Sequence, residues 1–104
     1  MATLIVSYPA AAGTRFDRDY YVATHLPLVK RVFGPHGLTS ADAYFPDDED
    51  VSGGGAVLAM AVLRFRDGAA RDAALAHADA GEAFGDIPNF TGAQPVAARV
   101  SATF

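Results

Sequence analysis

Apolar and polar residues follow two different periods along the first third of the chain. Residues 3–8 are rich in alternating β-branched and aromatic side chains, and turn-forming residues follow at 9–13. This pattern predicts a strand that ends in a turn. From residue 17 to residue 33 the apolar positions recur every three or four residues instead, which predicts an amphipathic helix. Asp17 suits the N-cap, so the helix is expected to begin at residue 17 or 18 and to end at the glycines of residues 34–37.

The remaining segments complete the order strand, helix, strand, strand, helix, strand. This βαββαβ order is that of the ferredoxin-like split unit, an α+β fold in which two helices cover one face of a four-stranded antiparallel sheet. With 104 residues the chain supports one hydrophobic core, so a single domain over residues 1–104 is expected. The elements predicted after the first helix are a strand at residues 38–45, a polar loop at 46–55, a strand at 56–65, a helix at 67–80, a loop at 81–89 and a strand at 90–104.

The third predicted strand is apolar on both of its faces. Two helices can cover only one face of such a sheet, and the chain has no further element for the other face. We therefore expect a homodimer in which the sheets of two subunits pack into one shared barrel. One face carries Leu58, Met60 and Val62, and the other carries Val57, Ala59, Ala61 and Leu63.

One stripe of the first predicted helix carries titratable side chains. At about 100° per residue, Tyr21, His25 and Val29 point in the same direction, so an imidazole and a phenol are expected on the buried side. Buried titratable groups are frequent at functional sites. Pro27 cannot donate a hydrogen bond to the preceding turn, and a kink or break is therefore expected just after His25.

Composition and charge limit the classes of binding partner that are expected. The chain has 8 basic and 12 acidic residues and no basic cluster, which argues against nucleic acid or an anionic membrane as the main partner. A small, largely uncharged, hydrophobic molecule is expected instead. There is no cysteine, so disulfides, thiolate metal sites and cysteine nucleophiles are excluded. The first residues enter a strand pattern without a basic leader, and no apolar run approaches about 18 residues, so a cytoplasmic location without a membrane span is expected.

Several segments lack the spacing of known binding motifs. The acidic residues 47–50 do not follow the pattern of a calcium loop, and the glycines at 53–55 precede a strand and lack the lysine of a phosphate-binding loop. His25, His36 and His77 show no metal-ligand spacing. No flavin or nicotinamide fingerprint is present. We therefore expect neither a metal nor a cofactor.

Four segments of the chain carry recognisable residues in a fixed order: Tyr8-Pro9, Phe16-Asp17-x-x-Tyr20-Tyr21-x-x-x-His25-x-Pro27-Leu28, Gly34-x-x-Gly37 and Asp86-Ile87-Pro88-Asn89-Phe90-Thr91. With these residues the chain resembles the EthD family, part of the dimeric α+β barrel superfamily. The resemblance covers nearly all 104 residues and implies a ferredoxin-like monomer, a homodimer and a pocket between the sheet and the helices. It leaves the reaction open, because the superfamily includes cofactor-free monooxygenases, lactone isomerases and dehydratases.

His25 is the candidate for acid–base chemistry. A neutral imidazole in a partly dry pocket can take a proton from an acidic carbon or a phenol and return it elsewhere. Asp86 is the candidate to orient that ring, and Tyr21, one turn before His25, could donate to a substrate carbonyl or enolate. The alternatives are a core histidine with one hydrogen bond, a turn or capping role for Asp86, and core packing for Tyr21.

Three further residues are candidates for substrate binding. Tyr8 and Phe90, at the end of the first strand and the start of the last, would be neighbours if these were the two inner strands, and they could line the pocket. Asn89 could hydrogen-bond a ligand, with a turn role as the alternative. Tyr20 is expected on a different side of the helix from Tyr21, at the surface or the dimer interface.

Two functions remain open from the sequence. The first is a cofactor-independent enzyme, of oxidoreductase, isomerase or dehydratase type, that acts on a small hydrophobic oxygenated or aromatic compound with His25 as general acid and base. The second is a non-catalytic dimeric protein that binds such a compound in the same pocket. A purely structural partner of an oxidative enzyme is a third and weaker alternative, in which side chains would fill the pocket.

Overall fold

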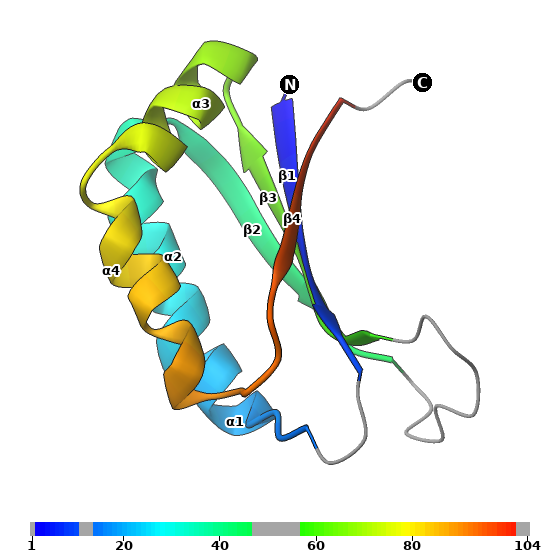
Figure 1. The fold of residues 1–104 in the computed structure, drawn as a ribbon. Coiled ribbons are helices and arrows are strands. Elements are labelled where there is room, and N and C mark those ends of the chain that lie inside the picture. Colours follow the sequence, from blue (N-terminus) through cyan, green and yellow to red (C-terminus); the bar gives the residue numbers. More distant parts are fainter. Residues whose placement is uncertain (1, 11–13, 47–56, 102–104) are drawn as a thin grey trace.

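A four-stranded antiparallel sheet carries all the helices on one side (Figure 1). The computed structural model describes residues 2–10, 14–46 and 57–101. Residues 11–13 of the predicted turn, residues 47–55 of the predicted loop, the first residue of the predicted third strand and the end of the predicted last strand lie outside these residues. The strands are β1 (Ala2–Pro9), β2 (Leu38–Tyr44), β3 (Val57–Phe65) and β4 (Val96–Ser101), in the spatial order β2-β3-β1-β4.

The helices belong to two segments of the chain, one before β2 and one after β3, and both segments lie on the same face of the sheet. They are called here the first and the second helical layer. The first is continuous from α1 through α2, and a π-helical turn separates the two. The second is divided into two short α-helices. The helical elements are α1 (Arg18–Tyr20), the π-helical turn Tyr21–His25, α2 (Leu26–Phe33), the 3-10 turn Gly34–His36, α3 (Gly68–Ala76), α4 (Ala80–Gly85) and the 3-10 turn Ile87–Asn89. This arrangement confirms the predicted α+β, ferredoxin-like fold.

Aspartate side chains begin both helical layers. Asp17 accepts a hydrogen bond from the backbone N–H of Tyr20 at 3.0 Å, and Asp67 accepts one from Ala70 at 2.7 Å. Each carboxylate satisfies a backbone donor that the first helical turn leaves free, as the sequence predicted for Asp17. Gly37 ends the first layer with a φ of 96°, and a Cβ there would lie 2.9 Å from the Cβ of Ala70. Glycine therefore allows both the turn and the close approach of α3.

The core lies between the helices and one face of the sheet. Alternate residues of β1 and β3 point into it, and the intervening residues point to the opposite face. The core side chains from these strands are Leu4, Val6, Tyr8, Ala59, Ala61, Leu63 and Phe65, and those from the helices include Tyr21, Val29, Val32, Phe33, Ala74, Ala83 and Ile87. Among the described residues, no helix is long and apolar enough to cross a membrane.

The second helical layer differs from the prediction. A single helix to residue 80 and a loop at 81–89 were expected, but α3 ends at Ala76, His77 is extended, and α4 occupies most of the predicted loop. Gly81 and Gly85 made this segment look like a loop. Its buried residues Ala80, Ala83 and Ile87 nevertheless recur at helical spacing, and burial of that stripe outweighs the low helix propensity of the glycines.

The last strand also differs from the prediction. β4 begins at Val96 rather than at residue 90, after Gly92 and Pro95, and Pro95 has no N–H with which to continue a ladder. The prediction that the first and last strands are the two inner strands was wrong, because the inner strands are β3 and β1 and β4 lies at the edge. Tyr8 and Phe90 are still neighbours, with ring centroids 5.6 Å apart, but through packing rather than strand pairing.

Candidate functional site

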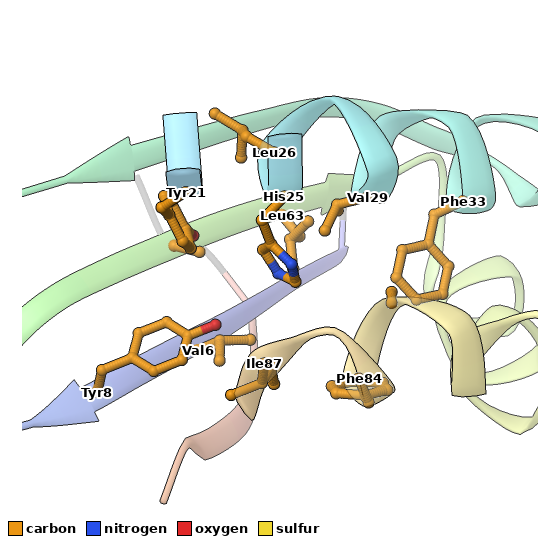
Figure 2. Close-up of a pocket in the computed structure, with 12 residues that line it drawn as sticks. Val6, Tyr8, Tyr21, His25, Leu26, Val29, Phe33, Leu63, Phe84 and Ile87 are labelled. Atoms are coloured by element: carbon orange, nitrogen blue, oxygen red, sulfur yellow. The ribbon is translucent and has the colours of Figure 1, made fainter. Parts of the chain in front are cut away.

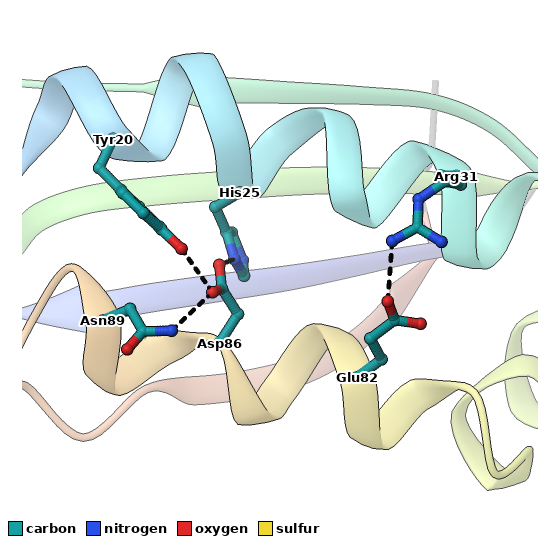
Figure 3. A network of polar contacts seen from close by, with 6 residues as sticks. All are labelled: Tyr20, His25, Arg31, Glu82, Asp86 and Asn89. Atoms are coloured by element: carbon teal, nitrogen blue, oxygen red, sulfur yellow. Dashed lines mark hydrogen bonds and ion pairs between the residues drawn. The ribbon is translucent and has the colours of Figure 1, made fainter.

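His25 and Asp86 meet between the two helical layers. His25 is the last residue of the π-helical turn, and Asp86 follows α4 directly. Nδ1 of His25 lies 2.9 Å from Oδ2 of Asp86, and both side chains are largely buried (Figure 3). A carboxylate on one ring nitrogen fixes which nitrogen carries the proton.

The other oxygen of Asp86 accepts two further hydrogen bonds. The hydroxyl of Tyr20 donates at 2.7 Å and the side-chain amide of Asn89 at 2.9 Å, both to Oδ1 (Figure 3). The expectation that Tyr20 serves the surface or a dimer interface is therefore wrong. Asn89 was predicted to bind a ligand, but the structure places its amide on Asp86.

The π-helical turn explains why Tyr20 joins His25. In this turn the N–H of Leu26 bonds to the carbonyl of Tyr21, five residues back, so each turn holds more residues than in an α-helix. Tyr20 and His25, five positions apart, therefore both point toward Asp86. The uniform 100° step of an α-helix would point them in different directions. Pro27 was expected to cause a kink or break after His25, but the helix continues with α-helical backbone angles from His25 to Leu26. The missing donor of Pro27 is accommodated by a change of hydrogen-bond register next to it.

The segment after Asp86 is tied to the segment before α1. The N–H of Asp17 donates to the carbonyl of Phe90 at 2.8 Å, the hydroxyl of Thr91 donates to the carbonyl of Arg15, and Arg15 donates to the carbonyl of Pro88 at 3.2 Å. These contacts join residues more than 70 positions apart in the sequence. They fix the ends of the two helical layers against each other, and with them the separation of His25 and Asp86.

The electrostatics of the pair favour a neutral imidazole beside a carboxylate. Burial lowers the pKa of His25 from its ordinary value, although Asp86 acts in the opposite direction. Burial alone would raise the pKa of Asp86, but hydrogen bonds from Asn89, Tyr20 and His25 outweigh it and the net shift is downward. An ionised carboxylate can only accept, so Nδ1 of His25 donates and Nε2 carries the lone pair. Among the described residues, Nε2 has no hydrogen-bond partner.

A mainly apolar cavity lies beside the His25 ring (Figure 2). Its volume is about 20 Å³, which is room for roughly one water molecule. Phe84 is partly exposed to solvent and Leu26 is half-buried, so the cavity approaches the surface near these two side chains. Its lining consists of Val6, Tyr8, Tyr21, His25, Leu26, Val29, Phe33, Ala61, Leu63, Ala83, Phe84 and Ile87.

Two phenols share this cavity with His25. Burial raises the pKa of Tyr21 to about 12 and that of Tyr8 above its usual range, with the Tyr21 hydroxyl as a further cause for Tyr8. Both phenols are therefore neutral donors near neutral pH. The ring of Tyr21 lies 5.2 Å from that of His25, and the Tyr8 hydroxyl points toward the same space (Figure 2).

The six predicted site residues thus divide into groups. Tyr8, Tyr21 and His25 line the cavity, and Asp86 holds the far side of the His25 ring. Phe90 packs against the His25 ring at 4.6 Å but does not line the cavity. The predicted substrate contacts of Phe90 and Asn89 therefore correspond here to packing and to a hydrogen bond on Asp86.

The other two histidines also lie together. His36 and His77 have ring centroids 4.3 Å apart, and both contact Asp79. No metal was predicted from the sequence, because these residues show no short ligand spacing. The fold brings residue 36 to residues 77 and 79, so that argument from linear spacing does not hold for this cluster.

Comparison with known proteins supports the fold and the resemblance. No family model matches the sequence, and no curated protein matches it. An EthD-like protein from Ralstonia eutropha has 27% identity and a TM-score of 0.81, and the match covers 96% of this chain and 89% of that one. The predicted resemblance to the EthD family is thereby confirmed.

Two more distant structures share the fold alone. SnoaB from Streptomyces nogalater, described as a cofactor-independent oxygenase, has 12% identity and a TM-score of 0.61, with 97% of this chain and 91% of that chain covered. A dimeric ferredoxin-like protein of unknown function from a Jannaschia species has 17% identity and a TM-score of 0.65, with 97% and 98% covered. At such identities the likeness supports the ferredoxin-like architecture and no particular chemistry.

Proposed function

We propose that this EthD-like protein is a cofactor-independent enzyme that transfers protons on a small hydrophobic, oxygenated or aromatic compound. One observation carries the proposal. His25 is held by Asp86 at Nδ1, while its Nε2 has no hydrogen-bond partner among the described residues and its ring borders a mainly apolar cavity. This is the geometry of an oriented general base.

The chemistry would proceed in two steps. Nε2 of His25 takes a proton from an acidic carbon or phenol of the substrate, and the resulting imidazolium is stabilised by the carboxylate of Asp86. The neutral phenols of Tyr8 and Tyr21 donate to the substrate oxygen on which negative charge develops. His25 then returns the proton to another atom. The likeness in fold to a cofactor-independent oxygenase is consistent with this proposal.

Substrate entry requires the cavity to enlarge. A volume of about 20 Å³ holds roughly one water molecule, so an aromatic compound must displace side chains. Phe84 is the natural candidate to move, because it lines the cavity and is partly exposed. We expect ligands that occupy the site to change the environment of the Phe84 ring.

The apolar lining also supports a second candidate function, a binding protein without turnover. Seven of the twelve lining residues are aliphatic side chains and two are phenylalanines, which suits a hydrophobic ligand without requiring a reaction. The two functions differ in the role of Nε2 of His25. An enzyme needs its lone pair, whereas a binding protein needs only the shape of the ring.

A carbon-acid probe separates the two candidates. 5-Nitrobenzisoxazole is small, aromatic and oxygenated, and it opens to a coloured phenolate when a base removes the proton on its isoxazole carbon and the N–O bond breaks. We expect the protein to accelerate this reaction and His25→Gln to reduce the rate by about 100-fold or more. Thr24→Ala, an exposed neighbour on the same helix, is the matched control and should keep the rate.

The outcomes are distinct. An equal rate in the wild-type protein and in His25→Gln would contradict general-base catalysis by His25. Saturable binding of the probe without acceleration, retained in His25→Gln, would support the binding protein instead. Circular dichroism of each variant confirms that the fold is intact.

We also propose that the protein is a homodimer that pairs through the open face of its sheet. Met60 and Val62 are half-buried on the face opposite the helices, beside Ile5 of β1, while Val96 and Tyr44 are exposed. Such an apolar face is typical of an interface. The Jannaschia protein of the same fold is described as dimeric.

Sedimentation equilibrium tests the dimer. We expect the wild-type protein to sediment as a dimer and Met60→Lys to sediment as a folded monomer, because a buried unpaired charge would oppose association. Ala73→Lys adds the same charge at an exposed position of α3 and should leave the dimer intact. A monomeric wild-type protein would contradict the proposal.

A further inference from the structure

Three segments that are distant in the sequence bring two imidazoles and a carboxylate together. His36 ends the 3-10 turn after α2, His77 follows α3, and Asp79 precedes α4, where the two short helices of the second layer join (Figure 1). The ligand atoms of all three residues lie within 4.8 Å of one another. None of the three lines the cavity beside His25.

The two separations from the Asp79 carboxylate fit a tetrahedral metal ion. Oδ2 of Asp79 lies 3.2 Å from Nε2 of His36 and 3.3 Å from Nδ1 of His77. Zinc–nitrogen and zinc–oxygen bonds of about 2.0–2.1 Å at tetrahedral angles separate two ligand atoms by roughly 3.3 Å. Both separations to Asp79 match this distance between two ligand atoms, and both are long for hydrogen bonds to a carboxylate.

The protonation state of His77 suits coordination. The backbone N–H of Asp79 donates to Nδ1 of His77 at 3.1 Å, so this nitrogen carries a lone pair and not a proton. An incoming ion would take the place of this weak contact. A neutral imidazole and an ionised carboxylate are the forms that bind divalent metals.

The site is open to solvent. The side chains of His36, His77 and Asp79 are 25%, 47% and 56% exposed, so an ion can enter without any change of fold. Solvent can supply the remaining coordination positions. With three protein ligands the site resembles open zinc sites, which keep water in the fourth position, and not the closed four-ligand structural sites.

From this geometry we propose that His36, His77 and Asp79 form a binding site for a divalent first-row transition metal ion, with zinc as the preferred probe. Imidazole and carboxylate ligands of this kind suit zinc, copper and nickel. Bound metal links the end of the first helical layer to the junction of α3 and α4. This site is separate from the His25 cavity and does not depend on the function proposed for it.

Calorimetric titration with zinc chloride tests the site. The full chain, without an affinity tag and stripped with a chelator, should bind one zinc ion per subunit. His36→Gln and Asp79→Asn should each weaken the affinity by at least about tenfold, because each removes one of three ligands. Glu82→Gln, which removes an exposed carboxylate from nearby α4, is the matched control and should bind zinc as the wild-type protein does.

Cobalt provides a second readout, because zinc has no d–d spectrum. Bound Co²⁺ should give visible absorption bands in the wild-type protein and in Glu82→Gln, and these bands should be lost in Asp79→Asn. Zinc should also raise the thermal midpoint of the wild-type protein and not that of Asp79→Asn. Absence of saturable zinc binding, or equal affinity in all variants, would overturn the proposal.

Discussion

Two groups of histidine and aspartate residues in this small protein differ in their surroundings more than in their composition. His25 and Asp86 are in contact at 2.9 Å with side chains only 5% and 12% exposed, and Tyr20 and Asn89 occupy the remaining oxygen. His36, His77 and Asp79 are in contact at 3.2–3.3 Å in an open position. Burial and the contact with Asp86 fix the orientation of one imidazole, as the proposed proton transfer requires. Exposure leaves the other two accessible to the proposed ion.

The comparison also predicts different contributions to stability. A buried carboxylate that accepts several hydrogen bonds leaves its donors unsatisfied when it is removed. An exposed carboxylate leaves its partners to water, which replaces most of the interaction.

Removal of the Asp86 carboxylate should have the largest effect. We expect Asp86→Ala to lower the free energy of unfolding by about 3 kcal/mol, because His25, Tyr20 and Asn89 lose their common acceptor. Asp79→Ala removes the same charge at the exposed cluster and should cost less than about 1 kcal/mol. Urea denaturation in the presence of a chelator measures both, and equal costs would contradict the distinction.

The pH dependence of stability should reveal His25. Burial lowers the pKa of His25 below its ordinary value of 6.5, so near and below that pH the unfolded chain binds more protons than the folded one. Stability should therefore decrease as the pH falls through 6.5 toward the lowered pKa of the folded state, by at most about 1.4 kcal/mol per pH unit from this group. The slope of unfolding free energy against pH should be smaller in His25→Asn. An unchanged slope would mean that other groups cause it.

Loss of the Tyr20 hydroxyl should have an intermediate effect. Tyr20→Phe removes one of the two bonds to Oδ1 of Asp86 and keeps the ring, so we expect a loss of about 1.5 kcal/mol in unfolding free energy. Thr24→Val removes a hydroxyl at an exposed position of the same helical segment and should have almost no effect. If both variants matched the wild-type protein, Tyr20 would not support Asp86 in solution.

The smallest effect is expected for an exposed ion pair that joins α2 to α4. Arg31 of α2 and Glu82 of α4 lie 2.8 Å apart with both side chains exposed (Figure 3). Glu82→Gln should change the unfolding free energy by about 0.5 kcal/mol or less, and less still at high salt. Denaturation at low and high salt provides the check. A loss as large as that of Asp86→Ala would show that exposure does not determine these contributions.

Periodicity in the sequence predicted most of the fold and only part of the site. The order of strands and helices along the chain, the Asp17 cap and the buried stripe of Tyr21 and His25 depend on local sequence patterns, which periodicity detects. α4 was missed because Gly81 and Gly85 obscured a stripe whose burial decides the structure.

The contact of Tyr20 with Asp86 and the contacts around Asp79 could not be predicted, because they depend on an irregular helical turn and on contacts between residues that are distant in the sequence. Tyr20 was assigned to the wrong side because a π-helical turn changes the step between it and His25. The contact of Tyr20 with Asp86, and that of His36 with Asp79, joins residues more than 40 positions apart. In the sequence, the signal for the π-helical turn was Pro27, which lies just after His25.

The most direct test of the proposed chemistry is the protonation of the two nitrogens of His25. A long-range ¹H–¹⁵N correlation spectrum at neutral pH, assigned with the His25→Asn variant, reports this state for each histidine. We expect a neutral ring with the proton on Nδ1 and a lone pair on Nε2. A ring protonated on Nε2, or on both nitrogens, would contradict it, because His25 would then have no free base to offer the cavity.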